Sequence, residues 1–412
     1  MGSNRRAPQG RLRRPAPVAP PVTLSAVTPL RWLILGQFVN RAASGVRFLL
    51  VFYLVAERDW SPAAAGAAAT AFALGALASQ PVAGWCADHY GRRAVLVGTM
   101  AGAAGALLAL GLARAPWLVG VTAFVAGALN EGYRPALQAM VADLATPDER
   151  VRAFGWVYWA NNAGFTLAMA AGGLLAGVDW LLVFALDAAG CAAFALLAWR
   201  RLPETRPVVA DEVAREPGGF ATALRDPLLL GLCGLQLAFA FMVMQSAATL
   251  PLSMEADGLG PAAYGIVMAF AGLVVVALQP SAASALEHRP RGLVLAGGLL
   301  LVGAGFAATT AATGVAGFAA TVGIWAVGEI AVACVAGAMV ADLAPVALRG
   351  RYMGVFSTVS PLAAVLAPVV GTALFELAGE AVLWSACGIV GVAAAVAAVG
   401  LSPALAARTR PA

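Results

Sequence analysis

The sequence predicts an all-α integral membrane protein with twelve transmembrane helices in two six-helix halves. Of its 412 residues, 61% are hydrophobic and only 11% are charged, whereas a soluble globular chain carries roughly 25% charged residues. This composition excludes a soluble enzyme, a disordered protein and a nucleic-acid-binding domain, and it indicates that much of the surface faces a lipid bilayer. Apolar stretches of about 20 residues, the length that crosses a bilayer, recur along the whole chain.

Short loops separate the expected helices, and one longer loop divides them into halves. The twelve apolar stretches cover 30–56, 62–87, 94–113, 117–144, 153–177, 180–199, 228–253, 262–286, 293–313, 316–343, 354–376 and 381–402. We therefore expect an N-terminal half at 30–199, a cytoplasmic linker at 200–227 and a C-terminal half at 228–402. Residues 1–29 lack the compact apolar core of a signal peptide, so we expect a disordered basic tail there and a second cytoplasmic tail at 403–412.

The positions of the arginines predict that both termini are cytoplasmic. All 26 basic residues are arginine, and with the N-terminus inside, 21 of them fall in cytoplasmic segments and only two, Arg58 and Arg114, in outer loops. Cytoplasmic loops carry an excess of basic residues, so this distribution supports both the helix count and the orientation. The abundance of Ala, Gly, Pro and Arg indicates a GC-rich bacterial genome, and we expect a multi-pass protein of the bacterial inner (plasma) membrane.

The two halves resemble each other at a constant offset of 199 residues. The segment Ala139–Ala145 recurs identically as Ala338–Ala344, and Arg150 matches Arg349 at the same offset. Further matches run from Gln37 with Gln236 to Gly172 with Gly371. Each half has an even number of helices, so the repeats are parallel, and the substrate site is expected between them near the bilayer midplane.

The loop after the second helix carries a specific motif. It contains five residues at fixed spacing: Gly84, Asp88, Gly91, Arg92 and Arg93. This spacing resembles the loop signature of the major facilitator superfamily, and the resemblance covers about residues 30–402. It implies the twelve-helix fold, alternating access, a central cavity, and a cytoplasmic latch between the halves in which Arg92 and Arg93 can pair with Asp143.

The residue types of this loop allow two interpretations. Gly91 permits a tight turn, and Asp88 can accept hydrogen bonds from the N-terminus of a neighbouring helix. We favour the latch because simple anchoring by basic residues on the inside needs neither Asp88 nor Gly91.

Residues of the fourth and fifth helices bear on whether transport is coupled to protons. Arg134, near the middle of the fourth helix, resembles the family's motif associated with proton transfer. Drug–proton antiporters of the family have Gly-Pro where the fifth helix has Ala168-Met169, so the chain departs from the antiporter motif at this point. The chain resembles bacterial drug and metabolite efflux members of the family.

Polar side chains inside apolar helices are the candidate site residues. A charge at the bilayer centre costs at least about 2.5–3.5 kcal/mol, so such groups face the protein interior or a wet cavity. The candidates for proton coupling are Glu131, Arg134, Asp187 and Glu329. The candidates for lining the substrate cavity are Gln37, Asn40, Arg41, Arg47, Tyr133, Asn161, Asn162, Gln236 and Gln245.

Each candidate has a structural alternative. Glu131 and Arg134 are three residues apart and can form a static pair on one helix, Asp187 can bridge helices, and the two glutamines can serve as interhelical hydrogen bonds. The three intramembrane arginines and three acids sum to zero charge, which predicts a neutral or zwitterionic substrate.

The sequence predicts a secondary active transporter that moves a small organic molecule, by proton-coupled export. An importer or facilitator of a polar metabolite and a non-transporting receptor on the same fold are the alternatives. A P-loop motif and lysine are both absent, so we expect no ATP-driven transport. The only histidines, His89 and His288, lie in loops, so we expect no metal site and no cofactor. No nucleophile–base set indicates an enzyme, the five scattered cysteines indicate no disulfide, and we expect a monomer.

Overall fold

The computed structural model describes residues 27–176, 178–206 and 219–409, and these ranges contain only helices, turns and loops. The N-terminal half contains α1 (Val27–Ala43), α2 (Val46–Ala56), α3 (Pro62–Tyr90), α4 (Arg92–Leu112), α5 (Pro116–Gly132), α6 (Arg134–Leu144), α7 (Arg150–Ala176) and α8 (Trp180–Arg201). The C-terminal half contains α11 (Pro227–Ala248), α12 (Leu250–Ala256), α13 (Pro261–Leu286), α14 (Arg291–Ala308), α15 (Gly314–Leu343), α16 (Arg349–Ala378) and α17 (Glu380–Thr409). Short 3₁₀ helices at Thr309–Ala311 and Val346–Leu348 follow α14 and precede α16.

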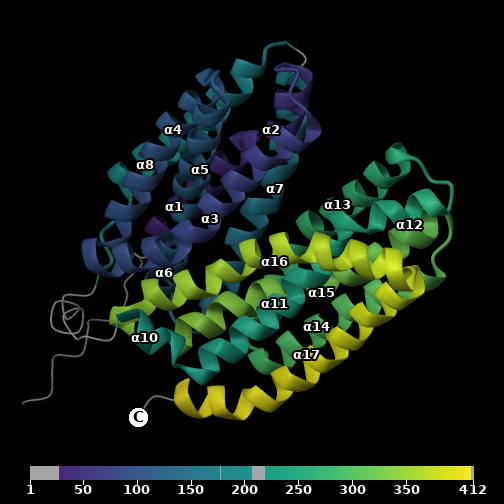
Figure 1. The fold of residues 1–412 in the computed structure, drawn as a ribbon. Coiled ribbons are helices and arrows are strands. Elements are labelled where there is room, and N and C mark those ends of the chain that lie inside the picture. The colour runs from purple at the N-terminus through teal and green to yellow at the C-terminus, as the bar shows by residue number, and fades with distance from the viewer. Residues whose placement is uncertain (1–26, 177, 207–218, 410–412) are drawn as a thin grey trace, which may run out of the picture.

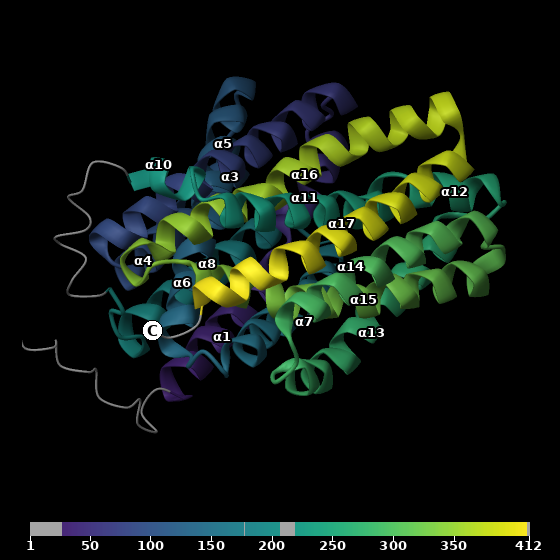
Figure 2. The ribbon, with the colours of Figure 1, turned by 90° about the horizontal axis from the view of Figure 1, so that it is seen from below.

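The two halves form separate bundles that meet at one end. Figure 1 shows them close together around α6, α10 (Gly219–Leu224) and α16, and diverging toward α2 and α12. Figure 2 shows the whole molecule from below, with α17 running along the outside of the C-terminal half. The halves touch mainly through α3 with α16 and through α7 with α13 and α15.

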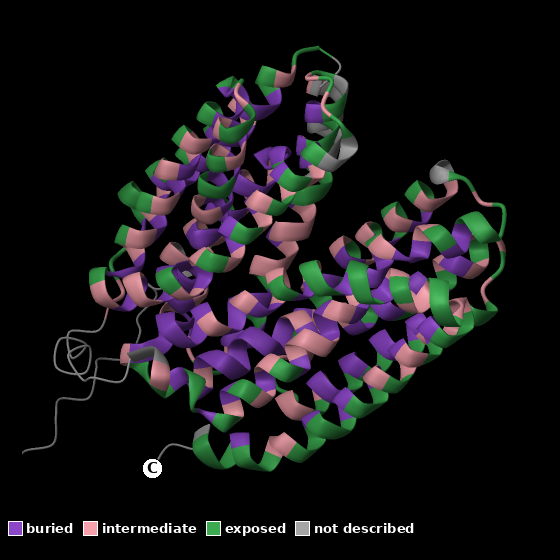
Figure 3. Cartoon of the chain, in the orientation of Figure 1, coloured by how far each residue is buried: buried purple, intermediate pink, exposed green. Residues whose placement is uncertain are grey.

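The outer faces of the helices are apolar, as a lipid environment requires. Buried residues lie on the faces where helices pack, and exposed residues lie on the outer faces (Figure 3). Large apolar side chains are among the exposed ones; Ile389 is 70% exposed and Leu377 is 89% exposed. Such a surface confirms a multi-pass membrane protein.

Nine helical segments in the described ranges are long and apolar enough to cross a bilayer. The predicted first, fourth and fifth spans are not among them. The first and fourth are each divided into two shorter helices, α1 with α2 and α5 with α6, and α7 carries Arg150, Arg152, Asn161 and Asn162. The count of twelve stays a prediction, as does the cytoplasmic position of both termini.

The break between α5 and α6 follows from Pro135. Proline has no N–H to donate to the carbonyl four residues earlier, and its ring clashes with that carbonyl. The carbonyl in question belongs to Glu131, and Gln80 of α3 supplies the missing donor at 3.1 Å. At the equivalent position of the second half stands Cys334 rather than proline, and α15 is continuous. Pro135 therefore explains why only the N-terminal copy of this helix is divided.

The boundaries differ from the prediction at the ends and in the linker. The last helix continues through Pro403 to Thr409, so most of the predicted tail at 403–412 is helical. The predicted linker at 200–227 contains α10 and the start of α11. Residues 1–26 of the predicted N-terminal tail lie outside the described residues.

Candidate functional site

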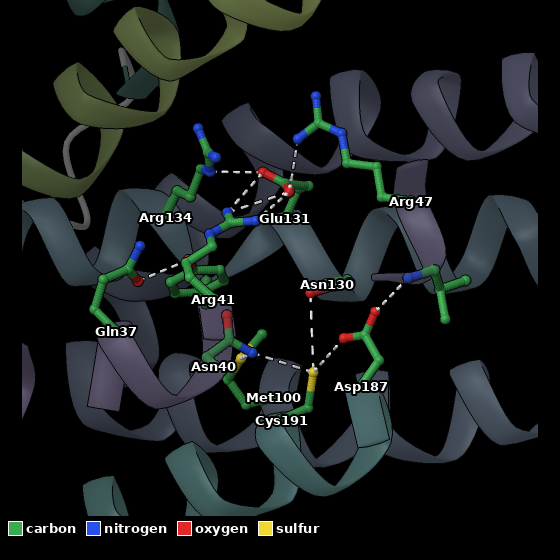
Figure 4. Close-up of polar contacts among 12 residues, drawn as sticks. Gln37, Asn40, Arg41, Arg47, Met100, Asn130, Glu131, Arg134, Asp187 and Cys191 are labelled. Atoms are coloured by element: carbon green, nitrogen blue, oxygen red, sulfur yellow. Dashed lines mark hydrogen bonds and ion pairs between the residues drawn. The ribbon is translucent and has the colours of Figure 1, made fainter. Parts of the chain in front are cut away.

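A cluster of three arginines around one carboxylate lies in the core of the N-terminal half. Glu131 lies in the last turn of α5. Its carboxylate pairs with Arg41 of α1 at 3.2 Å, with Arg47 of α2 at 3.1 Å and with Arg134 of α6 at 2.5 Å (Figure 4). The side chain of Glu131 is 4% exposed. The predicted pair of Glu131 and Arg134 is confirmed, but the carboxylate also pairs with two further arginines.

A cavity of about 190 Å³ lies between the two halves. Its walls come from α1, α6 and α7 on one side and from α11, α15 and α16 on the other. Its polar lining consists of Gln37, Tyr133, Arg134, Gln138, Tyr158, Asn161 and Gln236. The rest of the wall is apolar and includes Phe154, Phe239 and Phe356. This is the position at which the internal repeat predicts the substrate site.

Two contacts close the cavity wall. Tyr133, the residue between α5 and α6, donates to Oε1 of Gln37 at 2.8 Å. Ser357 of α16 donates to Oε1 of Gln138 at 2.9 Å and thereby joins the two halves. Both glutamines are held by a hydroxyl, so their amide groups have defined orientations.

Glu329 lies next to the cavity on the C-terminal half. Its carboxylate accepts a hydrogen bond from Tyr158 of α7, a cavity-lining residue of the opposite half. In the described part of the chain, Glu329 has no ion pair with an arginine. It differs in this from Glu131, although the two acids stand at nearly equivalent positions of the repeat.

Asp187 lies outside the cavity. It is fully buried on α8 and accepts the backbone N–H of Val46 at 3.1 Å, just after the gap between α1 and α2. Cys191, one turn later on α8, contacts Asp187 and also receives the amide of Asn40 at 3.3 Å. Asp187 therefore links α8 to the start of α2, at the break in the first predicted helix. This is the bridging role that was the structural alternative for Asp187.

Several of the predicted cavity residues lie outside the lining of this cavity. Asn40, Arg41 and Arg47 do not line the cavity, since Asn40 faces α4 and α8 and the two arginines face Glu131. Asn162 donates to the carbonyl of Tyr158 on its own helix at 3.0 Å. Gln245 is fully buried and donates to the carbonyl of Ala367 at 3.0 Å, so it joins α11 to α16 away from the cavity.

Asp88 caps a helix of the opposite half. Its carboxylate accepts the backbone N–H of Gly350 at 2.7 Å and that of Arg351 at 2.8 Å, at the start of α16. Gly84 makes this approach possible, because a Cβ there would lie 2.3 Å from the carbonyl oxygen of Gly350. The predicted contact between Asp88 and a helix N-terminus is confirmed.

Ion pairs surround this contact, and we call this region the ion-pair end of the molecule. Arg92 is fully buried and pairs with Asp88 at 3.4 Å and with Asp143 at 3.2 Å. Arg349 of the other half pairs with Asp143 at 2.6 Å. Arg93 donates to the carbonyl of Trp199, so its predicted pairing with Asp143 is wrong.

The linker after α8 also reaches the ion-pair end. Gly91 has a φ of +109°, which favours glycine. This turn exposes the first backbone N–H groups of α4, and the carboxylate of Glu204 accepts those of Arg92 and Arg93 at 2.8 and 3.2 Å. The next residue, Thr205, donates to Asp143 at 3.0 Å.

A mirror copy of these ion pairs lies on the second half and was missed by the sequence analysis. Asp342 pairs with Arg150 of the N-terminal half and with Arg291 of α14. Asp342, Arg291 and Arg349 stand 199 residues after Asp143, Arg92 and Arg150. Applying the offset of the repeat to the motif residues would have found this copy.

The comparisons with known proteins agree with this architecture. The sequence profile of the Major Facilitator Superfamily matches residues 33–334 and 246–412. The multidrug resistance protein MdtH of Escherichia coli O1:K1 / APEC is 26% identical over 325 residues, which cover 75% of this chain and 78% of MdtH.

Two solved transporters share the fold. The human organic anion transporter MFSD10 (TETRAN) superposes with a TM-score of 0.76 at 18% identity, covering 92% of this chain and all of that one. The proton:xylose symporter XylE, bound to 6-bromo-6-deoxy-D-glucose, superposes with a TM-score of 0.66 at 15% identity, covering 90% and 94%. The chain is thus a non-enzymatic membrane transporter and belongs to the Major Facilitator Superfamily.

Proposed function

We propose that this protein exports a small organic molecule by proton-coupled alternating access. The observation that carries the proposal is the cavity between the halves, with walls from three helices of each half and both polar and apolar side chains. A cavity with few polar groups in an apolar wall is typical of small-molecule sites.

The ion-pair end supports alternating access. Asp88 and Asp143 bind the start of α16, and Asp342 binds the start of α7. These contacts cross between the halves at one end of the molecule, while the halves diverge at the other end (Figure 1). Releasing them is the step that would open the ion-pair end to the cavity, so we assign them the role of a latch.

Glu329 is the acid that we assign to proton coupling. Glu131, the first candidate from the sequence, is the counter-ion of three arginines, so taking up a proton there would break ion pairs. Glu329 has only the hydroxyl of Tyr158 as a described partner. It can take or release a proton without disturbing an ion pair, and Tyr158 links it to the cavity wall.

The efflux direction is supported by the similarity to MdtH, a multidrug resistance protein. A second candidate function, the import of a polar metabolite, is favoured by the amide groups of Gln37, Asn161 and Gln236 in the cavity wall. The proton:xylose symporter of the same fold is an example of that type.

Everted membrane vesicles from a bacterial host test the proposal. Respiration acidifies their interior, and a compound that enters in exchange for protons partly collapses the pH gradient, which a quenched acridine dye reports. We expect such a response for at least one compound in a set of anionic, neutral and cationic probes, and its loss in Glu329→Gln.

Three results would contradict the proposal. A compound that enters right-side-out vesicles together with protons would establish import. Accumulation that persists in Glu329→Gln would place coupling elsewhere. Binding without flux or counterflow in proteoliposomes would indicate a receptor.

A further inference from the structure

We infer that the cavity binds a small organic anion, a carboxylate with an apolar body, through the guanidinium of Arg134. The inference deepens the proposed function by naming the substrate class, and it applies to either direction of transport. It starts from the charge of the cavity wall. Among the described residues that line the cavity, Arg134 is the only one that carries a charge.

The guanidinium of Arg134 has hydrogen-bond donors that the described residues do not use. Its Nε pairs with Glu131, while its two terminal nitrogens have no acceptor within the described part of the chain. The side chain is 32% exposed, in contrast to 5% for Arg41. Figure 4 shows the terminal nitrogens of Arg134 pointing away from the cluster. Two parallel N–H groups of this kind match the two oxygens of a carboxylate.

The surrounding charge favours an anion. Arg41, Arg47 and Arg134 share the single carboxylate of Glu131, so the cluster has a net charge of +2. Asp187 forms no ion pair with these arginines, and Glu329 does not line the cavity. The neutral sum that predicted a neutral or zwitterionic substrate is therefore misleading, because the six groups do not share one cavity.

The rest of the wall indicates the body of the anion. Phe154, Val157, Phe239 and Phe356 supply apolar and aromatic surface. The volume of about 190 Å³ is smaller than the roughly 300–1,000 Å³ of sites for drug-sized ligands. A carboxylate on one aromatic ring or a short aliphatic chain fits both the surface and the size.

Three probes with one body and different charges test the inference: benzoate, benzamide and benzamidinium. Purified protein in lipid nanodiscs is titrated with each, and binding is followed by thermal stabilisation and by displacement of radiolabelled benzoate. We expect benzoate to bind at least tenfold more tightly than the other two. Loss of a bidentate, charge-assisted pair in Arg134→Gln is expected to weaken benzoate about tenfold or more.

Two further variants separate binding from folding. Arg134→Lys keeps the charge but loses the planar pair of donors, so we expect intermediate affinity. Arg47→Gln removes another partner of Glu131 that does not line the cavity, so we expect a smaller loss than in Arg134→Gln. Loss of affinity in Arg134→Gln with an unchanged unfolding midpoint and intermediate affinity in Arg134→Lys supports the inference.

The inferred anion site would be overturned if the three probes bound equally or if benzamidinium bound best. It would also be overturned if neither benzoate nor any of its homologues from acetate to naphthoate bound. Proton exchange driven only by neutral or cationic compounds would overturn the anion but keep the proposed transporter. Tight benzoate binding without flux of any compound would keep the anion site and remove the transport function.

Discussion

Asp88→Asn is expected to shift the molecule from the state with a closed ion-pair end to a state in which that end is open. Asp88 accepts two backbone N–H groups of α16 at 2.7 and 2.8 Å and is fully buried. Asparagine keeps one acceptor oxygen, so one of these bonds is lost and the other loses its charge. Hydrogen bonds to charged groups contribute roughly 1.5–3 kcal/mol each. We therefore estimate that the closed state loses about 3 kcal/mol of stability relative to the open state. Since about 1.4 kcal/mol is a factor of ten, the closed-to-open ratio should fall roughly a hundredfold.

Distances between spin labels measure this shift directly. Glu57, directly after α2, and Glu255 of α12 are exposed and belong to the elements that diverge in Figure 1. Both are replaced by labelled cysteine in a chain without the five native cysteines. Wild-type protein should give mainly the long distance, and Asp88→Asn should give a large fraction of a shorter one together with slowed transport.

The matched control is Asp179→Asn. Asp179 also caps a helix, accepting the N–H of Leu181 at 2.8 Å, but it is exposed and acts within one half. Its replacement should leave the distance distribution unchanged. If Asp88→Asn inserts normally and shows wild-type distances and transport rates, the latch is refuted, and basic anchoring remains as the role of this loop.

Three further changes have defined outcomes. Glu131→Gln should destabilise the protein by about 3–5 kcal/mol, the cost of breaking a buried ion pair from one side; a wild-type thermal midpoint would contradict the ion-pair cluster. Glu329→Gln should abolish uphill transport in proteoliposomes while substrate exchange continues, and coupling that survives would exclude Glu329. Burial raises the pKa of Asp226, but hydrogen bonds from Tyr352 and Arg408 outweigh it and lower the pKa below its usual range. A carboxylate of this kind stabilises above its unfolded pKa of roughly 4 and loses that effect as the pH falls. Protection of the end of α17 against hydrogen exchange, corrected for the intrinsic pH dependence of exchange, should therefore fall below about pH 4, and Arg408→Gln should lack this protection already at pH 7. Protection that does not change with pH would contradict the role of the Asp226–Arg408 ion pair.

The membrane fold and the Asp88 contact could be predicted because each depends on local sequence. Apolar length alone predicts spanning helices, and the fixed spacing of Gly84, Asp88 and Gly91 allows a close approach, a cap and a turn. The mirror ion pairs at Asp342 were also accessible, since the repeat offset gives their positions.

The cavity could not be predicted in the same way. Whether a polar side chain faces the cavity depends on the rotation and packing of its helix, and neighbouring residues such as Asn161 and Asn162 differ in this respect. Arg134 lines the cavity, whereas Arg41 does not. Arg134 directly follows the break that Pro135 introduces between α5 and α6, and no spacing rule predicts how such a break orients a side chain. The sum of the intramembrane charges therefore does not describe the charge of the cavity wall, where Arg134 is the one charged residue among the described lining residues.

The proline at 135 has a mechanical consequence. The two halves descend from one repeat, yet one copy of the helix beside the cavity is divided at Tyr133 and the other, α15, runs unbroken for 30 residues, about 45 Å. A divided helix can reorient a few side chains locally, whereas a continuous one carries a displacement from end to end. We therefore expect the divided N-terminal copy to reorient locally when a substrate binds, and the continuous α15 to move as one rigid unit.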